Sequence, residues 1–361
     1  TNTFTIMQIS LLALLFVFQS YTGIQHKPVT QSLTLAACQQ TSPETTGATA
    51  VNIIYRSTDG GQTWEDLSEG LPENLNVWSV FASGDNVYLG SEKGLYHSTT
   101  PPVMEPWNKE HFLGDPISDI FPGKKGLYAS SFGIGFFQNI AGTDLWRPMH
   151  NTLKDRHIRS VVEMPDGTLF VACDSGVFKS SDAGETWKHV FDQYMIMSLV
   201  ATDGVLVAAG VGGLLRSTDN GEHWDNVLSE DGRVQKAELF DGRIFAITRG
   251  SGSYQEVRDD PEHMANRLRI SADQGKTWQR MDQSLSTARL MNAVVEDLAP
   301  VWSINDIKQA GSYLFCSLDS GIFRSADGGK SWKLMLPVKN RMSFRLAVSG
   351  KTIFAVIGGG C

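Results

Sequence analysis

The sequence is poor in cysteine and contains no run of like charges. Its four cysteines are Cys38, Cys173, Cys316 and Cys361, and neither they nor the histidines show metal-ligand spacing, so we expect no metal and no cofactor. Cys173 and Cys316 occupy equivalent strand positions in different repeats and are interpreted as small, buried hydrophobic residues. The net charge of -8 argues against a nucleic-acid-binding protein, which would present a basic stripe.

Long helical periodicity is also missing, whereas glycine and aromatic residues are plentiful, as in a protein of many short strands. The apolar stretch Ile6–Phe18 is too short to span a bilayer comfortably and is typical of a signal-peptide core, with cleavage near Ser20–Gly23. A second interpretation uses Leu35–Cys38, which resembles a bacterial lipobox with Cys38 as the lipidated residue, although Ile24–Thr34 separate it from the apolar stretch. We therefore predict an exported bacterial protein with a signal-like segment at 1–23, a linker or membrane tether at 24–48 and a folded domain at 49–361.

The folded region contains five copies of the pattern Ser-x-Asp-x-Gly-x-Thr-Trp, in which the hydroxyl residue varies slightly. Each aspartate is expected to accept hydrogen bonds from backbone N–H groups inside a tight hairpin, while glycine supplies the positive φ and tryptophan packs on a neighbouring unit. A structural role is therefore predicted for Asp59, Asp182, Asp219, Asp273 and Asp327.

This pattern resembles the Asp-box, or BNR, repeat of sialidase-like β-propellers. Two degenerate units fill the gaps, so that the repeating tryptophans are Trp64, Trp107, Trp146, Trp187, Trp224, Trp278 and Trp332. Seven units of about 40 residues match four-stranded propeller blades. The first unit has only outer strands, at Asn52–Arg56 and around Trp64, and the last residues supply inner strands at Phe344–Val348 and Thr352–Ile357. The prediction is an all-β, seven-bladed propeller whose ring is closed by strands from both termini.

Two tryptophan spacings of 54 residues, against 37 to 43 elsewhere, reveal insertions at 249–267 and 279–300. Both emerge on the face where the inner strands begin, and long loops on a rigid scaffold commonly carry function. Aligning the inner strands gives a polar column, which comprises Ser79, Asp119, Ser160, Ser198, Lys236, Asp306 and Arg345. The predicted ligand-binding residues are Trp78, Arg159, Lys236, Asn305 and Arg345, with Tyr254 and Glu256 from the first insertion.

The functional interpretation has two branches. A sialidase would need three arginines, a different blade count and an Arg-Ile-Pro motif that is absent, and xyloglucanase-like enzymes place two such rings around a cleft. The single ring is more similar to exported seven-bladed propellers that bind partners, including the photosystem II assembly-factor type. We predict a monomeric module that binds a glycan or a protein, without nucleic acid; the alternative is a glycoside hydrolase that uses Asp119 and Asp306.

Overall fold

The computed structural model describes residues 52–99, 106–111, 116–141, 143, 145–229, 232–250, 267–282, 284–285, 304–338 and 343–358. The chain divides into two compact units, 1–44 and 45–361, and every described residue belongs to the second. The predicted boundaries after residues 23 and 48, together with Cys38, lie outside the described residues. Within that described part, no helix combines the length and the apolar character that crossing a membrane requires.

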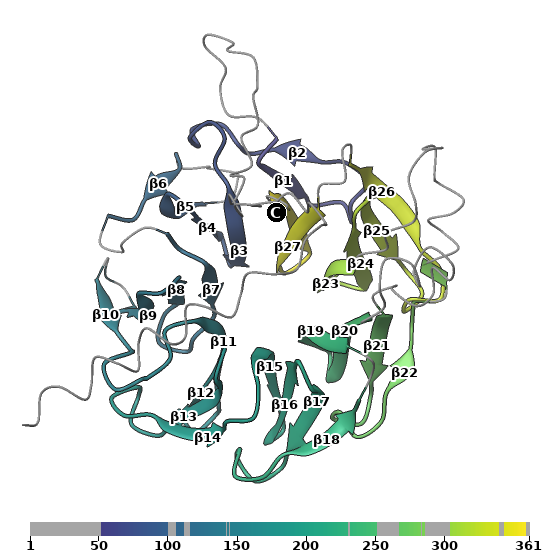
Figure 1. Ribbon diagram of the computed structural model, residues 1–361. Coiled ribbons are helices and arrows are strands. Elements are labelled where there is room, and N and C mark those ends of the chain that lie inside the picture. Colours follow the sequence, from purple (N-terminus) through teal and green to yellow (C-terminus); the bar gives the residue numbers. More distant parts are fainter. Residues whose placement is uncertain are drawn as a thin grey trace, which may run out of the picture. The chain divides into compact units, whose positions relative to one another are not determined.

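The described residues form short antiparallel strands, and five sheets contain four strands each (Figure 1). The first of these is β7 (Asp119–Phe121), β8 (Tyr128–Ser131), β9 (Gly135–Asn139) and β10 (Trp146–Pro148). It is followed by β11 (Ile158–Glu163), β12 (Leu169–Cys173), β13 (Gly176–Ser180) and β14 (Lys188–Phe191). The third is β15 (Ile196–Thr202), β16 (Val205–Gly210), β17 (Gly213–Ser217) and β18 (Asp225–Leu228). The last two are β19 (Gly232–Phe240), β20 (Arg243–Gly250), β21 (Arg267–Ser271) and β22 (Gln279–Arg280), then β23 (Ile304–Ala310), β24 (Tyr313–Leu318), β25 (Gly321–Ser325) and β26 (Lys333–Pro337).

The remaining eight strands combine the two ends of the unit. One group contains β3 (Val77–Ser83), β4 (Asn86–Ser91), β5 (Gly94–Thr99) and β6 (Asn108–Lys109). The other contains β27 (Ser343–Ser349), β28 (Thr352–Gly358), β1 (Ile54–Ser57) and β2 (Glu65–Asp66). Strand β28 pairs with β1 along its length, from Ile54 opposite Val356 to Ser57 opposite Ile353. One parallel pair, Val77 with Gly358, joins the two groups into a single hydrogen-bonded sheet.

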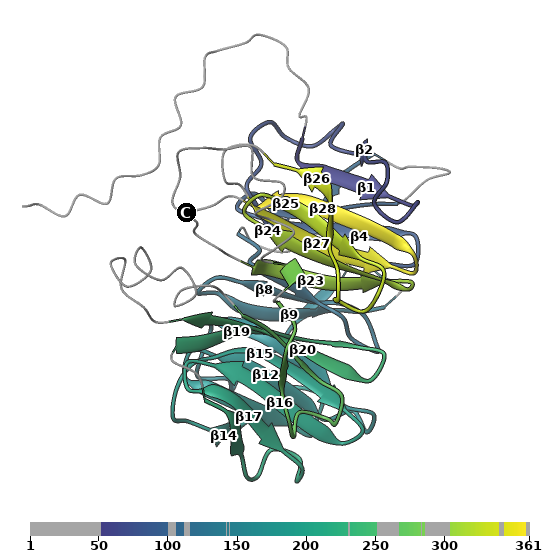
Figure 2. The same cartoon turned by 90° about the vertical axis from the view of Figure 1, so that its right-hand side faces the viewer.

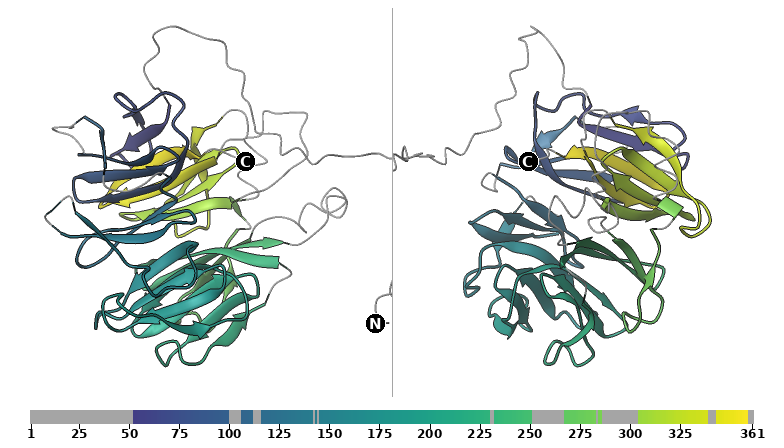
Figure 3. Two further views of the ribbon diagram at one scale, coloured as in Figure 1. Left: turned by 60° about the vertical axis from the view of Figure 1, so that its left-hand side comes forward. Right: turned by 45° about the vertical axis from the view of Figure 1, so that its right-hand side comes forward.

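The first strand of each group lies innermost. Contacts run from β3 to β7 and on through β11, β15, β19, β23 and β27, and β27 also contacts β3. Figure 1 shows these strands facing a common centre, and Figures 2 and 3 show neighbouring sheets packed face to face. These observations establish an all-β protein with blade-like four-stranded sheets, a β-propeller fold.

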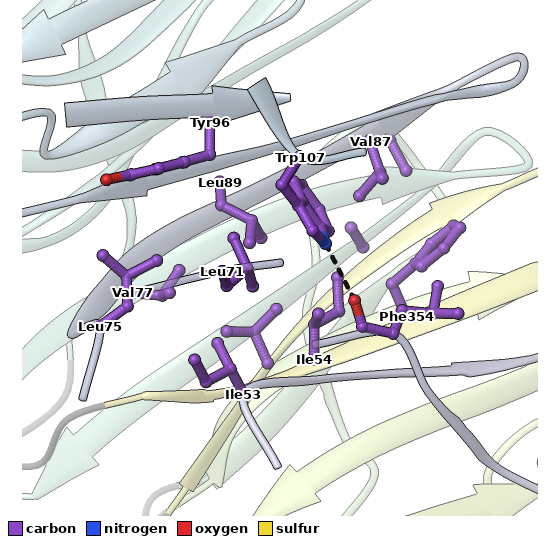
Figure 4. Close-up of a cluster of buried hydrophobic side chains, with 14 residues drawn as sticks. Ile53, Ile54, Leu71, Leu75, Val77, Val87, Leu89, Tyr96, Trp107 and Phe354 are labelled. Carbon is purple, nitrogen blue, oxygen red and sulfur yellow. Dashed lines mark hydrogen bonds between the residues drawn. The ribbon is translucent and has the colours of Figure 1, made fainter. Parts of the chain in front are cut away.

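The core is divided into apolar clusters, most of them between neighbouring sheets. One cluster joins β1 and β28 to β3 and β4, and its members include Ile54, Leu89, Trp107 and Phe354 (Figure 4). Because the middle strands are covered on both faces, β12 and β16 are buried at every position. Outer strands such as β2 are exposed.

Cys173 and Cys316 are unpaired and buried, which confirms the predicted apolar role. The prediction that they occupy equivalent positions is wrong. Cys173 pairs with Gly176, the first residue of β13, whereas the residue opposite the matching Gly321 of β25 is Leu318, two residues beyond Cys316. The two strands consist of similar small and branched apolar residues, so the sequence alone does not reveal this shift of two residues.

The repeated hairpins show the hydrogen bonds that the sequence predicts. In the first copy, Asp59 Oδ1 accepts hydrogen bonds from the backbone N–H groups of Gln62 at 2.8 Å and Thr63 at 3.0 Å. Asp59 Oδ2 accepts from Thr63 Oγ1 at 2.6 Å, and Ser57 Oγ accepts from the Gly61 N–H at 2.8 Å. Gly61 has a φ of 84°, which glycine adopts without strain. The hydrogen bonds from Thr63 lower the pKa of Asp59 well below its usual range.

Candidate functional site

Five innermost strands carry an extra residue near their start. In β3, for example, Val77 lies opposite Ser91 and Ser79 opposite Gly90, so that Trp78 has no partner in the ladder. The same shift occurs in β11, β15, β19 and β23, where the extra residues are Arg159, Met197, Gln235 and Asn305. Such a bulge re-aims a side chain away from the ladder. These are the positions that the sequence alignment placed immediately before the polar column.

A pocket of about 410 Å³ lies where four adjacent innermost strands begin. It is lined by Trp78 from β3, Ser118 and Asp119 at β7, Ile158 and Arg159 of β11 and Arg345 of β27, together with Pro116, Phe132 and His157. Four residues predicted for the site therefore meet in one place: Trp78, Asp119, Arg159 and Arg345. They come from four different strands, β3, β7, β11 and β27, which lie far apart in the sequence.

One wall of the pocket is held by Asp174, in the turn between β12 and β13. Its Oδ1 accepts a hydrogen bond from Arg159 Nε, and its Oδ2 lies 3.0 Å from His157 Nδ1. The His157 ring stacks on Phe132 with the ring centroids 4.6 Å apart. Phe132 is 61% exposed, so this wall presents an apolar ring to solvent although the ring stacks on His157. Asp174 thus fixes two cationic or polar groups of this wall at once.

The pocket lining also contains two charged groups without such partners. Among the described residues, neither Asp119 nor Arg345 forms an ion pair or a side-chain hydrogen bond. Burial raises the pKa of Asp119 to about 7, against the lowering influence of Arg345, Lys236 and Arg159. The side chain is nevertheless partly accessible from the pocket. A carboxyl group that is half protonated near neutral pH and an unpaired guanidinium therefore share one cavity.

Lys236 and Asp306 lie outside this pocket lining and take part in a partly buried charge cluster. Lys236 Nζ lies 2.6 Å from Asp306 Oδ1 and 2.8 Å from Glu238 Oε1, and Lys308 Nζ lies 2.6 Å from the same Glu238 oxygen. Burial alone would lower the pKa of Lys236, but the two carboxylates outweigh it and raise that pKa. Of the charged residues Lys236, Asp306 and Arg345 of the predicted polar column, the first two therefore pair with each other, while Arg345 lines the pocket.

Several residues of the polar column tie one sheet to the next. In each case a side-chain oxygen accepts a hydrogen bond from the backbone N–H that follows the column position of the next innermost strand. The pairs are Ser160 with Leu199 at 3.0 Å, Ser198 with Ala237 at 3.2 Å and Asp306 with Leu346 at 2.9 Å. Asp306 is only 4% exposed, and its Oδ1 also accepts from the Ile307 N–H. Ser79, by contrast, has a buried Oγ with no partner among the described residues.

The other predicted residues are placed differently. Asn305 is exposed and does not line the pocket, while Tyr254, Glu256 and most of both insertions lie outside the described residues. The sequence analysis missed Phe132, His157 and Asp174. A signal for Phe132 does exist, because the glycines of Ser131-Phe132-Gly133-Ile134-Gly135 indicate a turn, where an aromatic side chain is expected to be exposed.

Comparison with solved structures shows the fold. The chain is similar to YCF48 from Cyanidioschyzon merolae, with a TM-score of 0.55, 13% identity, and coverage of 80% of this chain and 95% of that chain. It is also similar to the extracellular domain of a protein from B. thetaiotaomicron described as a hybrid two component system, with a TM-score of 0.56 and 12% identity; 86% of this chain is covered but only 39% of that chain. An ancestral GH74 enzyme has a TM-score of 0.50 at 14% identity, with coverage of 80% of this chain and 48% of that chain.

A search among curated proteins finds no match. A family model described as photosynthesis system II assembly factor YCF48 matches residues 31–250, which is more than half of the 361 residues. This match covers three of the five Asp-box repeats and three of the four innermost strands whose starts form the pocket, while Arg345 lies beyond it. With its BNR repeats and its propeller fold, the chain belongs to the family of the photosynthesis system II assembly factor YCF48.

Proposed function

We propose that this protein is an exported, seven-bladed binding module that holds a partner through the pocket at the start of β27, β3, β7 and β11. The observation that carries the proposal is that two charged side chains of the pocket lack a partner. Arg345 and Asp119 find no partner among the described residues, and Phe132 exposes an apolar ring beside them. A guanidinium and aromatic faces in one concave site suit an external ligand that brings an anionic group and an apolar body.

The blade count in this proposal rests on the strand groups. Seven groups of four strands are obtained when the eight-stranded sheet is divided at its one parallel pair, Val77 with Gly358. The pairing of β1 with β28 supports closure by both ends of the chain. Export is inferred from the apolar stretch Ile6–Phe18, with a membrane tether at Cys38 as the second sequence-based inference.

The proposed binding face also includes the strand ends that flank the first long insertion, 249–267. Strand β20 ends at Gly250 and β21 begins at Arg267, at the edge of their sheet where β19 starts. Antiparallel strands alternate in direction, so this edge corresponds to the β8–β9 turn that carries Phe132. We favour a protein as the partner because the family is described as an assembly factor. A glycan is the other outcome that the experiment below can give.

A glycoside hydrolase is less well supported. Such enzymes use two carboxyl groups on either side of the scissile bond. Asp119 lines the pocket, but both oxygens of Asp306 already accept hydrogen bonds, from Lys236 and Ile307 at Oδ1 and from Leu346 at Oδ2. The described lining of the pocket thus includes one carboxyl group, and the likeness to the GH74 enzyme concerns the fold alone.

The proposal can be tested on arrays of acidic and apolar peptides and of acidic and neutral glycans. The wild type, Arg345→Ala and the control Arg243→Ala are compared. Arg243 begins β20 at the opposite edge of its sheet, away from the pocket. We expect the wild type and Arg243→Ala to bind the same subset of anionic peptides, and Arg345→Ala to lose at least ten-fold in affinity, which corresponds to about 1.4 kcal/mol. Undiminished binding by Arg345→Ala, or equal loss in both variants, would exclude this pocket as the binding site.

A further inference from the structure

Asp119 differs from the other aspartates near the centre of the fold in having no partner. The carboxylate of Asp174 is paired with Arg159 and His157, and that of Asp306 with Lys236 and two backbone N–H groups. Within the described part of the chain, the Asp119 carboxylate accepts no hydrogen bond, although it lines a pocket with two arginines. A partly buried polar group without a partner is costly and needs an explanation, and a ligand that enters the pocket would supply one.

The charges around Asp119 come from several elements. Arg345 faces it from β27, Arg159 from β11 and Lys236 from β19, and each favours its ionised form. Arg159 is already neutralised by Asp174, and Lys236 by Asp306 and Glu238. His157 lines the same pocket and is also held by Asp174. Trp78 from β3 and Ser118 next to Asp119 add no charge. Arg345 is therefore the cation in this set whose charge remains available to a ligand.

We propose that the pocket binds an amphipathic monocarboxylate together with one proton, Arg345 pairing with the ligand anion while neutral Asp119 donates a hydrogen bond to it. This inference rests on the proposed binding function and specifies its ligand chemistry and its regulation. In the ionised state, Asp119 repels the ligand carboxylate and competes for Arg345. In the neutral state, it becomes a donor and leaves the full charge of Arg345 to the ligand. The proton is taken from solvent and forms the O–H bond of neutral Asp119, and the ligand itself undergoes no covalent change.

The geometry also limits the charge and shape of the ligand. One unpaired guanidinium and one neutral acid complement a single negative charge, whereas a dianionic phosphate would require a second free cation. The remaining walls are apolar or aromatic, from Trp78, Pro116, Phe132 and Ile158. A cavity of about 410 Å³ has room for one ring and a short polar chain. N-acetyl-L-phenylalanine fits this description and keeps its carboxylate ionised throughout the neutral range.

The titration position of Asp119 gives the expected size of the effect. Burial raises its pKa to about 7, so roughly nine-tenths of the free protein carries the proton at pH 6 and roughly one-tenth at pH 8. When only one state is competent to bind, the apparent dissociation constant increases as the competent fraction falls. We therefore expect the affinity for N-acetyl-L-phenylalanine to fall about ten-fold between pH 6 and pH 8.

The experiment is isothermal titration calorimetry of the full chain at pH 6 and pH 8, with N-acetyl-L-phenylalanine and its uncharged amide. The variants are Asp119→Asn, which imitates the neutral acid at every pH, and His157→Gln, which removes the imidazole that lines the same pocket. We expect the wild type and His157→Gln to show the ten-fold change, and Asp119→Asn to bind nearly equally at both pH values. Buffers with different ionisation enthalpies should reveal uptake of close to one proton at pH 8 by the wild type.

Each remaining outcome contradicts a specific step. Equal wild-type affinity at both pH values, or a pH dependence that persists in Asp119→Asn, overturns the proton linkage and leaves the binding function standing. Loss of the dependence in His157→Gln assigns it to the histidine and also overturns the inference. Equal binding of the amide overturns the role of Arg345 in recognising an anion. If the probe does not bind at either pH but array ligands do, the ligand class is wrong; if neither binds, the proposed function itself fails.

Discussion

Two buried tryptophans offer a direct test of how much a single hydrogen bond between repeats stabilises the ring. Trp107 is 8% exposed, and its Nε1–H donates to the Leu67 carbonyl oxygen at 2.9 Å (Figure 4). Trp332 is 7% exposed, and its Nε1 has no partner among the described residues. Both rings pack in apolar clusters. Replacing each by phenylalanine removes similar apolar area but changes the hydrogen bonding in opposite ways.

In Trp107→Phe, the Leu67 carbonyl oxygen loses its side-chain donor in a buried environment, which costs about 1–3 kcal/mol beyond the lost packing. In Trp332→Phe, the substitution deletes a buried N–H that was already unpaired, so the packing loss is partly offset. We therefore expect Trp107→Phe to be the less stable variant by about 1–3 kcal/mol. The assay is urea denaturation of both variants and the wild type, followed by tryptophan fluorescence and circular dichroism. Equal destabilisation, or a larger loss in Trp332→Phe, would refute the assignment of the bond and of the unpaired donor.

Three further predictions concern the centre of the fold. Because the folded-state pKa of Asp119 is raised from 3.8 to about 7, its contribution to stability is fully present below pH 3.8 and lost as the pH rises through 7. Asp119→Asn should therefore be more stable than the wild type at pH 8, by up to about 4 kcal/mol in the free energy of unfolding, and should not be more stable at pH 4. The measurement is thermal denaturation at both pH values, and an identical difference between the two proteins at pH 4 and pH 8 would contradict this prediction. Asp306→Ala leaves Lys236 with one carboxylate fewer and should cost about 3–5 kcal/mol in thermal denaturation, and a near-neutral result would show that the cluster is already solvated. Ser198→Ala should cost about 1–3 kcal/mol because it removes the bond to the next strand, whereas Ser79→Ala should be neutral in the same urea experiment; the reverse order would disprove the link between sheets.

The propeller fold could be predicted because its local rules repeat along the chain. Each Asp-box hairpin uses the same hydrogen bonds, so that Asp59 and its counterparts mark the same turn in five units. Register was harder to predict. Cys173 and Cys316 lie in short strands of interchangeable small and apolar residues, where a shift of two positions leaves the pattern of buried side chains unchanged.

The candidate site was predictable only where the strands themselves supply it. Trp78 and Arg159 occupy bulges that recur at the same place in the innermost strands, so that alignment of the repeats finds them. Phe132 and His157 lie outside strands, and their positions depend on a ring stack between two sheets that no repeat pattern encodes. The hydrogen-bond partners of the polar column could not be predicted from the sequence either. The sequence placed Lys236, Asp306 and Arg345 in one column, but only the folded chain shows that Asp306 bonds to the backbone at Leu346.

The arrangement of β1 and β28 has a consequence for biosynthesis. Strand β1 contributes residues near position 54, and its partner lies near position 356, so that the sheet they share needs chain segments separated by nearly the whole folded unit. During translation the other sheets can form in order as their strands leave the ribosome, whereas β1 keeps one edge unpaired until β28 has been synthesised. Ribosome-bound chains that stop before residue 343 lack β27 and β28 and should therefore expose the unpaired backbone N–H and C=O groups of β1. We expect chaperones to bind these chains, and β1 to pair with other chains, more than in the completed fold.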